Sequence, residues 1–263
     1  MNLEVFFFAL AIVAARPLGA ADAGPLPVSD AVMHRTWTGR WIACPDAPER
    51  DPGVFRFRKV LEMAAVPGRF VVHVSGDQRF ILFVNGRRVG VGPSRGDLYH
   101  WRFETFDLAP RLNPARNLLV ATVWNFWTQA PAAKVTERSG FVVEGDGDGE
   151  KAANTDGSWQ CAPEPGHQPW PEGAAALKRA TYAVVGPGER LEAARYDWDW
   201  ERLPLSGDPG RWRAAVESGP ANPRTISEGP GYGLSPEGRW LVPDKLPPME
   251  SRPVSAGTVA KAS

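Results

Sequence analysis

Cysteine is scarce in this sequence, with only Cys44 and Cys161 among 263 residues. They do not form a C-x-x-C pair, which excludes a thioredoxin-like redox motif and a zinc knuckle. Two isolated cysteines either join in one disulfide, here across the central region, or lie apart as small buried hydrophobes. Both alternatives stay open, because the sequence does not give the Cα separation that decides between them.

An excess of either charge is also absent, since 30 Lys and Arg residues balance 30 Asp and Glu residues. This balance gives no indication of a nucleic-acid partner. The histidines lack metal-ligand spacing such as H-E-x-x-H, so we predict no metal and no other cofactor. They are His34, His73, His100 and His167. We expect His73, which lies within a β-prone run, to be a hydrogen-bonded residue of the core or of a sheet face.

Long apolar runs are missing beyond the N-terminus, where the run from Val5 to Ala15 is too short to span a bilayer. Small residues follow it at Gly19 and Ala20. We therefore predict a signal peptide over residues 1–20, a linker over 21–35, and a secreted or periplasmic protein without membrane attachment after cleavage. Glu4 is the only charged residue before the run, where Lys or Arg is usual, so a buried N-terminal segment is the alternative.

Helical periodicity is nearly absent, and the best helical candidate is the short segment Glu172–Ala180. The sequence is instead rich in turn formers, with 27 Gly and 26 Pro, and in short β-prone runs at intervals of roughly 8 to 12 residues. This pattern predicts an all-β fold, either a sandwich or a barrel. The predicted strands include Phe55–Val60, Phe70–Val74, Phe80–Val84, Asn117–Val123 and Phe141–Val143.

The dipeptide Asn85-Gly86 separates two apolar runs, which predicts a β-hairpin with a type I′ turn because both residues tolerate positive φ. The residue pattern of the sequence changes after Cys161, where closely spaced prolines interrupt regular structure. We predict a β-sandwich over 36–165, an irregular Pro- and Gly-rich extension over 166–245 and a poorly ordered tail over 246–263. Within the extension, strand-like pieces occur at Thr181–Val185 and Arg239–Val242.

Two motifs suggest chemistry but lack the context that the chemistry needs. Residues 92–96 (GPSRG) match the G-x-S-x-G nucleophile elbow around Ser94, but no helix follows, so we favour a turn over a serine hydrolase. The acidic, glycine-rich stretch Glu144–Glu150 resembles a calcium-binding loop in composition. An EF-hand loop started at Asp146 places Lys151 where glycine is required, so we expect a solvated hairpin tip.

Aromatic residues are the better candidates for function, because a flat indole face can stack on the C–H bonds of a sugar ring. Nearby amide, carboxylate and guanidinium groups can then bind hydroxyls. The alternative is that these tryptophans fill a core or a domain interface, since Trp is highly buried on average. The carbohydrate-binding candidates are Arg95, Asp97, Trp101, Trp124, Asn125 and Trp127.

Several sequence motifs in the same region resemble those of a known family. Asn85-Gly86 within Asp77–Gly86, then Gly92-Pro93-x-Arg95-x-Asp97 and Phe106-Asp107-Leu108, resemble the N-terminal region of bacterial α-L-rhamnosidases of glycoside hydrolase family 78. Further similarity occurs over 117–125, 155–159 and 185–190, and the whole resemblance spans about residues 41–249. One departure is Ala115, where such domains usually carry glycine.

The resemblance implies a jelly-roll, galactose-binding-like β-sandwich. In the family, an (α/α)6 barrel that follows these β-domains carries the catalytic acids, and no position of this sequence corresponds to it. We therefore hypothesise a non-catalytic accessory region of a rhamnosidase-like protein, whose partner is a rhamnose-containing glycan or a separate catalytic domain. The alternatives are a stand-alone carbohydrate-binding or structural module and a serine hydrolase that uses Ser94.

Overall fold

The structure is a computed structural model that describes residues 25–45, 47–131, 134–170, 187–205, 209–226 and 238–247. The predicted signal peptide, the helix at 172–180, the strand at 181–185 and almost all of the predicted tail lie outside these residues. Within them, no helix has both the length and the apolar character needed to cross a membrane.

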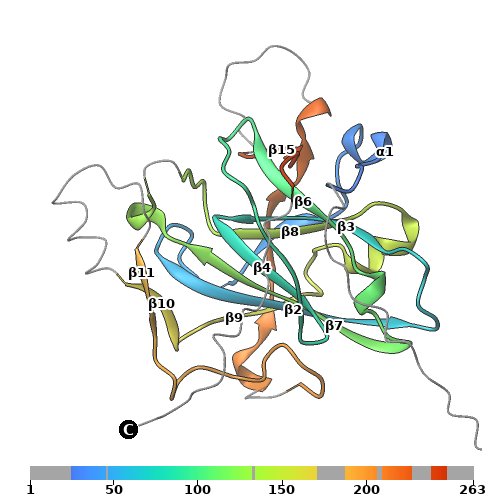
Figure 1. Ribbon diagram of the computed structural model, residues 1–263. Coiled ribbons are helices and arrows are strands. Elements are labelled where there is room, and N and C mark those ends of the chain that lie inside the picture. Colours follow the sequence, from blue (N-terminus) through green and yellow to red (C-terminus); the bar gives the residue numbers. More distant parts are fainter. Residues whose placement is uncertain are drawn as a thin grey trace, which may run out of the picture.

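The described residues form two large antiparallel-rich sheets, and β6 and β8 of one sheet lie above β2 and β9 of the other (Figure 1). The first sheet has the order β13 (Val216–Pro220), β1 (Arg40–Ala43), β8 (Gly140–Gly145), β3 (Val71–Asp77), β6 (Trp101–Asp107), β15 (Trp240–Pro243) and β14 (Asn222–Pro223). The second has the order β12 (Arg213–Ala214), β9 (Gln160–Pro163), β2 (Gly53–Met63), β7 (Ala115–Asn125), β4 (Arg79–Val84) and β5 (Arg87–Gly92). The prediction of an all-β sandwich is confirmed.

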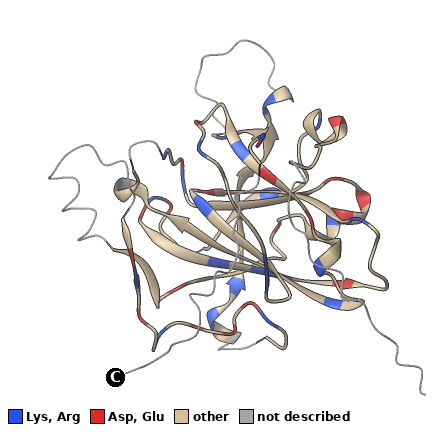
Figure 2. Ribbon diagram, in the orientation of Figure 1, with Lys and Arg blue, Asp and Glu red and all other residues tan. Residues whose placement is uncertain are grey.

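Smaller elements connect and flank the sheets. β10 (His167–Trp170) and β11 (Gly188–Leu191) form a separate two-stranded ribbon. The helical elements of the described residues are short: α1 (Asp30–Met33), η1 (Ala109–Arg111), η2 (Trp127–Gln129), η3 (Asp148–Ala153), η4 (Pro209–Arg211) and η5 (Arg224–Ile226). Lys and Arg residues are interspersed with Asp and Glu residues along the ribbon, as expected for zero net charge (Figure 2).

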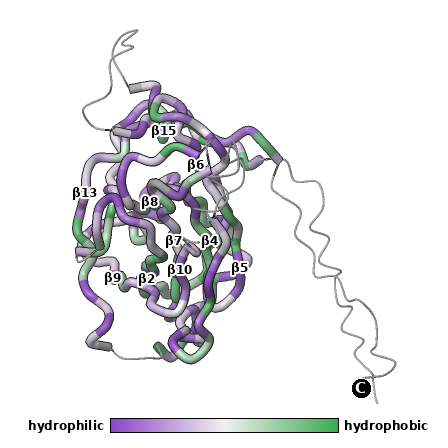
Figure 3. The backbone as a smooth tube through the Cα atoms, turned by 90° about the vertical axis from the view of Figure 1, so that its left-hand side faces the viewer, coloured by the Kyte–Doolittle hydropathy of each residue, from purple (hydrophilic) through white to green (hydrophobic). Residues whose placement is uncertain are grey.

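The main core lies between the two sheets. Hydrophobic and hydrophilic residues follow one another closely along the chain (Figure 3). Phe57 of β2 stacks on Phe141 of β8 with 5.4 Å between ring centroids. Along β4, Phe80, Leu82 and Val84 are buried while the residues between them are half-buried. This period of two is the expected consequence of side chains that alternate between the faces of a strand.

Strand β7 is buried on both faces. Leu119 and Val123 point into the core between the sheets, whereas Leu118 and Val120 pack against Trp200 on the outer face. The mostly apolar run of β7 is therefore explained, because a strand covered on both sides needs no polar face. Its outer cover comes from the segment that the sequence suggested was an irregular extension.

The predicted hairpin turn is confirmed, with φ of 51° at Asn85 and 74° at Gly86. The Asn85 side chain also accepts from the backbone N–H of Leu118 (2.9 Å) and donates to Oδ1 of Asn117 (2.8 Å). Asn117 in turn accepts from the N–H of Asn113 (2.7 Å) and donates to its carbonyl (2.8 Å). Two motifs that are distant in sequence thus support one another, and their role is structural.

The turn before β7 contains Ala115 with φ of 72°. A left-handed conformation places the Cβ of an L-residue close to its own backbone and costs about 1 kcal/mol or more, whereas glycine adopts it freely. The departure from glycine noted in the sequence therefore falls at a position whose backbone favours glycine.

The segments outside 36–165 are built into the sandwich. β13 pairs with β1, β12 pairs with β9, and β15 lies parallel to β6. In the segment predicted as a linker, Ser29 caps α1 and Val32 is fully buried. The strand expected at 239–242 is confirmed as β15.

A buried arginine, Arg239, anchors the segment that leads into β15. Its guanidinium lies 3.6 Å from the ring centroid of Trp41 and donates to Oδ2 of Asp77 (3.0 Å). The same carboxylate accepts from the hydroxyl of Thr136 (2.7 Å) and from the backbone N–H groups of Glu137 (2.9 Å) and Arg138 (3.0 Å). Burial raises the pKa of Asp77, and Arg239 with the other donors opposes this rise.

A second buried arginine, Arg56 of β2, lies on the other sheet. Its guanidinium is 4.6 Å from the ring of Tyr196 and 4.4 Å from the ring of Trp200, and it forms an ion pair with the buried Glu164. The carboxylate of Asp197 lies 3.7 Å away and is 15% exposed. Arg56 thus attaches residues 196–200 to the outer face of the second sheet.

Candidate functional site

Three of the predicted carbohydrate-binding residues are buried and serve the fold. The indole of Trp101 is 4% exposed and donates to the hydroxyl of Ser75 (3.1 Å). Trp124 packs beneath Arg79, whose guanidinium is 4.4 Å from its ring. Asn125 is fully buried and accepts from the N–H of Trp127 (2.8 Å). In this structure Trp101, Trp124 and Asn125 therefore present no surface to a sugar.

The other three candidates are accessible. Trp127 is half-buried with Arg50 over its ring at 5.4 Å, whereas Arg95 and Asp97 are exposed on the loop between β5 and β6. Asp97 accepts from the N–H of His100 (2.8 Å), and its Oδ1 lies 3.0 Å from Nδ1 of the same residue. Asp97 therefore orients His100 rather than standing free for a ligand.

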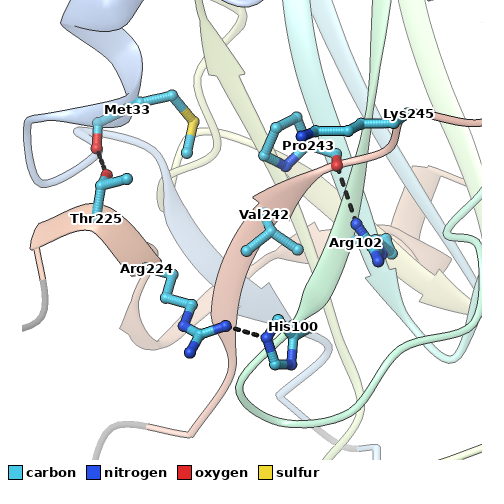
Figure 4. A pocket seen from close by; sticks show the side chains of 8 residues that line it. All are labelled: Met33, His100, Arg102, Arg224, Thr225, Val242, Pro243 and Lys245. Atoms are coloured by element: carbon cyan, nitrogen blue, oxygen red, sulfur yellow. Dashed lines mark hydrogen bonds between the residues drawn. The ribbon is translucent and has the colours of Figure 1, made fainter. Parts of the chain in front are cut away.

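His100 forms part of a pocket of about 530 Å³ between the loop that precedes β6, η5 and the end of β15 (Figure 4). Its ionisable lining residues are His100, Arg102, Arg224 and Lys245, and we call this set the cationic pocket. The remaining lining residues are Met33, Thr225, Val242 and Pro243. Segments far apart in the sequence thus meet at this pocket, and of the predicted residues only Asp97 contacts it, through His100.

Hydrogen bonds hold the pocket's walls together (Figure 4). Arg224 contacts Nε2 of His100, and Thr225 donates to the carbonyl of Met33. Arg102 donates to the carbonyl of Pro243 (3.2 Å). Because a guanidinium only donates, Nε2 of His100 acts as the acceptor, which places the imidazole proton on Nδ1 toward Asp97. A chain from Asp97 through His100 therefore positions Arg224.

A cluster of ionisable groups surrounds Ser94 next to the pocket. The Ser94 hydroxyl donates to Asp244, and its N–H donates to Glu104 (3.2 Å). Burial raises the pKa of Glu104 to about 7, and the carboxylate of Asp244 adds to the rise. Burial lowers the pKa of Lys134, which donates to the carbonyl of Pro93 (3.2 Å), to about 8.

This cluster was not foreseen from the sequence, because Glu104, Lys134 and Asp244 come from three distant segments without a shared motif. The Ser94 hydroxyl is hydrogen-bonded to the carboxylate of Asp244, and the described chain runs from β5 to β6 without the helix that follows the serine in a nucleophile elbow. Ser94 thus holds β15 against the loop that follows β5.

Other residues singled out in the sequence have structural partners. His73 is buried between Thr105 (3.0 Å) and Asp146 (3.1 Å), as expected, and burial lowers its pKa to about 4. Glu144, expected in a solvated tip, is instead a buried residue of β8 that accepts from the N–H of Gly39 (2.6 Å). Its burial is offset by an ion pair with Arg35 (2.9 Å) and by hydrogen bonds from the N–H of Gly39 and the side-chain amide of Asn154.

Both cysteines are buried in the core between the sheets. The structure has them as thiols rather than as a disulfide. The Cys161 thiol lies 3.9 Å from the carbonyl of Ala43. This arrangement agrees with the second of the two alternatives, in which each cysteine is a small buried hydrophobic residue.

The sequence matches no protein-family model and no curated protein. Solved structures do match. A family 78 rhamnosidase of Bacillus sp. GL1 superimposes with a TM-score of 0.62 at 26% identity, covering 80% of this chain and 20% of that protein. The α-L-rhamnosidase from Dictyoglumus thermophilum gives 0.55 at 16% identity, with 81% and 23% covered.

The native α-L-rhamnosidase from Aspergillus terreus gives a TM-score of 0.50 at 15% identity, covering 72% of this chain and 22% of that protein. The chain therefore spans about a fifth of the length of the rhamnosidases that it resembles. The resemblance to family 78 α-L-rhamnosidases that the sequence predicted is confirmed.

Proposed function

We propose that this chain is a non-catalytic, carbohydrate-binding accessory module of an α-L-rhamnosidase-type glycoside hydrolase, exported from the cell. The observation that carries the proposal is the similarity of 80% of the chain to one fifth of a family 78 rhamnosidase. The residues that carry the resemblance in sequence, such as Asn85 and Asn117, bind one another and shape turns. This structural role supports a scaffold that serves a catalytic unit elsewhere.

Binding and turnover are to be measured separately. Isothermal titration calorimetry with rhamnose-containing oligosaccharides tests binding, and we expect a saturable signal that glucose oligosaccharides of equal length do not give. Release of nitrophenol from an aryl α-L-rhamnoside tests catalysis, and we expect no turnover above the uncatalysed rate. Robust turnover by the purified chain would contradict the non-catalytic role.

The second candidate is a purely structural module whose partner is a catalytic domain. It is supported by exposed apolar side chains near the β10–β11 ribbon, where Leu191 is 49% and Trp198 is 58% exposed. Absence of glycan binding, together with a stable complex with a separately produced family 78 catalytic barrel, would favour this candidate. Export is tested by N-terminal sequencing of the secreted protein, which we expect to begin at Ala21.

A further inference from the structure

We propose that the cationic pocket binds an acidic saccharide, namely a sugar residue that carries a carboxylate. This inference rests on the proposed carbohydrate-binding function and names the class of sugar. Within the described chain the pocket is lined by three cationic side chains, Arg102, Arg224 and Lys245, with His100 between two of them.

The hydrogen-bonding character of the lining favours an anion over a neutral sugar. A sugar hydroxyl both donates and accepts, and sites for neutral sugars need acceptors such as carboxylates and amides. The eight lining residues include no Asp, Glu, Asn or Gln. Arg102, Arg224 and Lys245 offer N–H donors only, which match the lone pairs of a carboxylate.

The nearest acidic side chains direct their hydrogen bonds to groups other than Arg224 and Lys245, although the charge of Asp244 interacts with that of Arg102. Asp97 is hydrogen-bonded to His100, and Asp244 accepts from Ser94 and from the N–H of Leu246 (3.0 Å). Among the described residues, neither Arg224 nor Lys245 forms an ion pair with a carboxylate. An arriving carboxylate would gain charge-assisted hydrogen bonds from Arg224 and Lys245 without displacing a carboxylate of the protein.

Size and apolar lining suit a sugar rather than a bare anion. A volume of about 530 Å³ is within the range of small-molecule sites and far exceeds that of an inorganic ion. Val242 and Pro243 of β15 and the side chain of Met33 line the pocket between the cations (Figure 4). These groups can cover the C–H face of a sugar ring while the arginines bind its carboxylate.

The test compares one sugar in charged and neutral form by isothermal titration calorimetry. Digalacturonate is titrated against its dimethyl ester, and we expect the acid to bind at least tenfold more tightly, with affinity that falls as salt is added. Arg224→Gln and Lys245→Gln are each expected to weaken binding at least fivefold. Arg87→Gln, which removes an exposed arginine of β5 outside the pocket, is the matched control and should leave affinity unchanged.

Several outcomes would overturn the proposal. They are equal binding of acid and ester, equal loss in the Arg87→Gln control, tighter binding of galactose 6-sulfate, or competition by inorganic sulfate at the same concentration. Circular dichroism confirms that each variant is folded. If neutral rhamno-oligosaccharides bind while digalacturonate does not, the acidic-sugar inference fails and the proposed function stands. If neither binds, both fail.

Discussion

Arg239 and Arg56 are each buried against aromatic rings, yet their surroundings differ in a way that predicts different energetic roles. Arg239 faces one fully buried carboxylate, Asp77, whose hydrogen bonds are all supplied by the protein. Arg56 divides its charge between buried Glu164 and the partly exposed Asp197. A buried charge with one partner is vulnerable to loss of that partner, whereas a buried charge with two partners keeps one when the other is removed.

The largest effect is expected from Asp77→Ala, which leaves Arg239 buried without its carboxylate. We expect a loss of about 3–5 kcal/mol in the free energy of unfolding. Urea unfolding followed by tryptophan fluorescence measures it. Asp148→Ala removes an exposed carboxylate as the control and should change stability by less than about 0.5 kcal/mol. A loss below about 1 kcal/mol for Asp77→Ala would break the comparison.

The free energy of unfolding is expected to depend on pH through Glu104. This residue, together with Ser94 and Asp244, holds β15, the strand that follows Arg239. The pKa of Glu104 is raised to about 7, so between pH 4.5 and 7 the folded state binds more protons than the unfolded state. This contribution is present below pH 4.5 and is lost as the pH rises through 7. Glu104→Gln should remove that fall in stability, measured by urea unfolding at several pH values.

His73 provides the opposite trend in the same experiment. Its pKa is lowered to about 4, so its contribution to stability is lost as the pH falls from 6.5 toward 4. The two trends oppose each other in the wild type and separate in Glu104→Gln, whose stability should rise with pH over this range. An unchanged pH profile in Glu104→Gln would contradict the assignment.

A third substitution, Ala115→Gly, tests backbone strain at a position away from both arginines. Ala115→Gly relieves the positive φ at the start of β7 and should stabilise the protein by about 1 kcal/mol. Differential scanning calorimetry measures the gain as a higher Tm. Ala130→Gly, at a residue with φ of −59°, is the control and should not stabilise. A lower Tm for Ala115→Gly would show that the turn tolerates alanine without strain.

The smallest effect is expected from Asp197→Ala. Its carboxylate is 3.7 Å from Arg56 and partly exposed, and Glu164 remains as a partner, so the loss should be about 0–1 kcal/mol. Urea unfolding under the same conditions as for Asp77→Ala gives the direct contrast. A loss equal to that of Asp77→Ala would show that both arginines depend on every carboxylate around them.

Local signals in the sequence predicted the parts of the fold that depend on local chemistry. The Asn85-Gly86 turn and the alternating strand β4 follow from backbone preference and from period-two burial. The mostly apolar run of β7 indicates that its outer face is covered. The sequence does not identify Trp200 as the covering residue, because nothing in it relates residue 118 to residue 200.

The candidate site was harder to predict because its residues meet only through tertiary structure. Asp97 was identified, but its role of orienting His100 depends on a turn that the sequence does not show. Arg224 and Lys245 have no motif, and they join the pocket through η5 and β15. Trp101 and Trp124 were candidates for sugar stacking with burial in a core as the alternative, and in the structure both are buried.

The parallel pairing of β15 with β6 has a consequence for synthesis on the ribosome. Arg102 and Pro243, which are hydrogen-bonded across this pair, are 141 residues apart in sequence. At typical translation rates the edge of β6 waits roughly ten seconds for its neighbour to emerge. During that interval the nascent chain exposes an unpaired, aromatic strand edge that chaperones would be expected to cover.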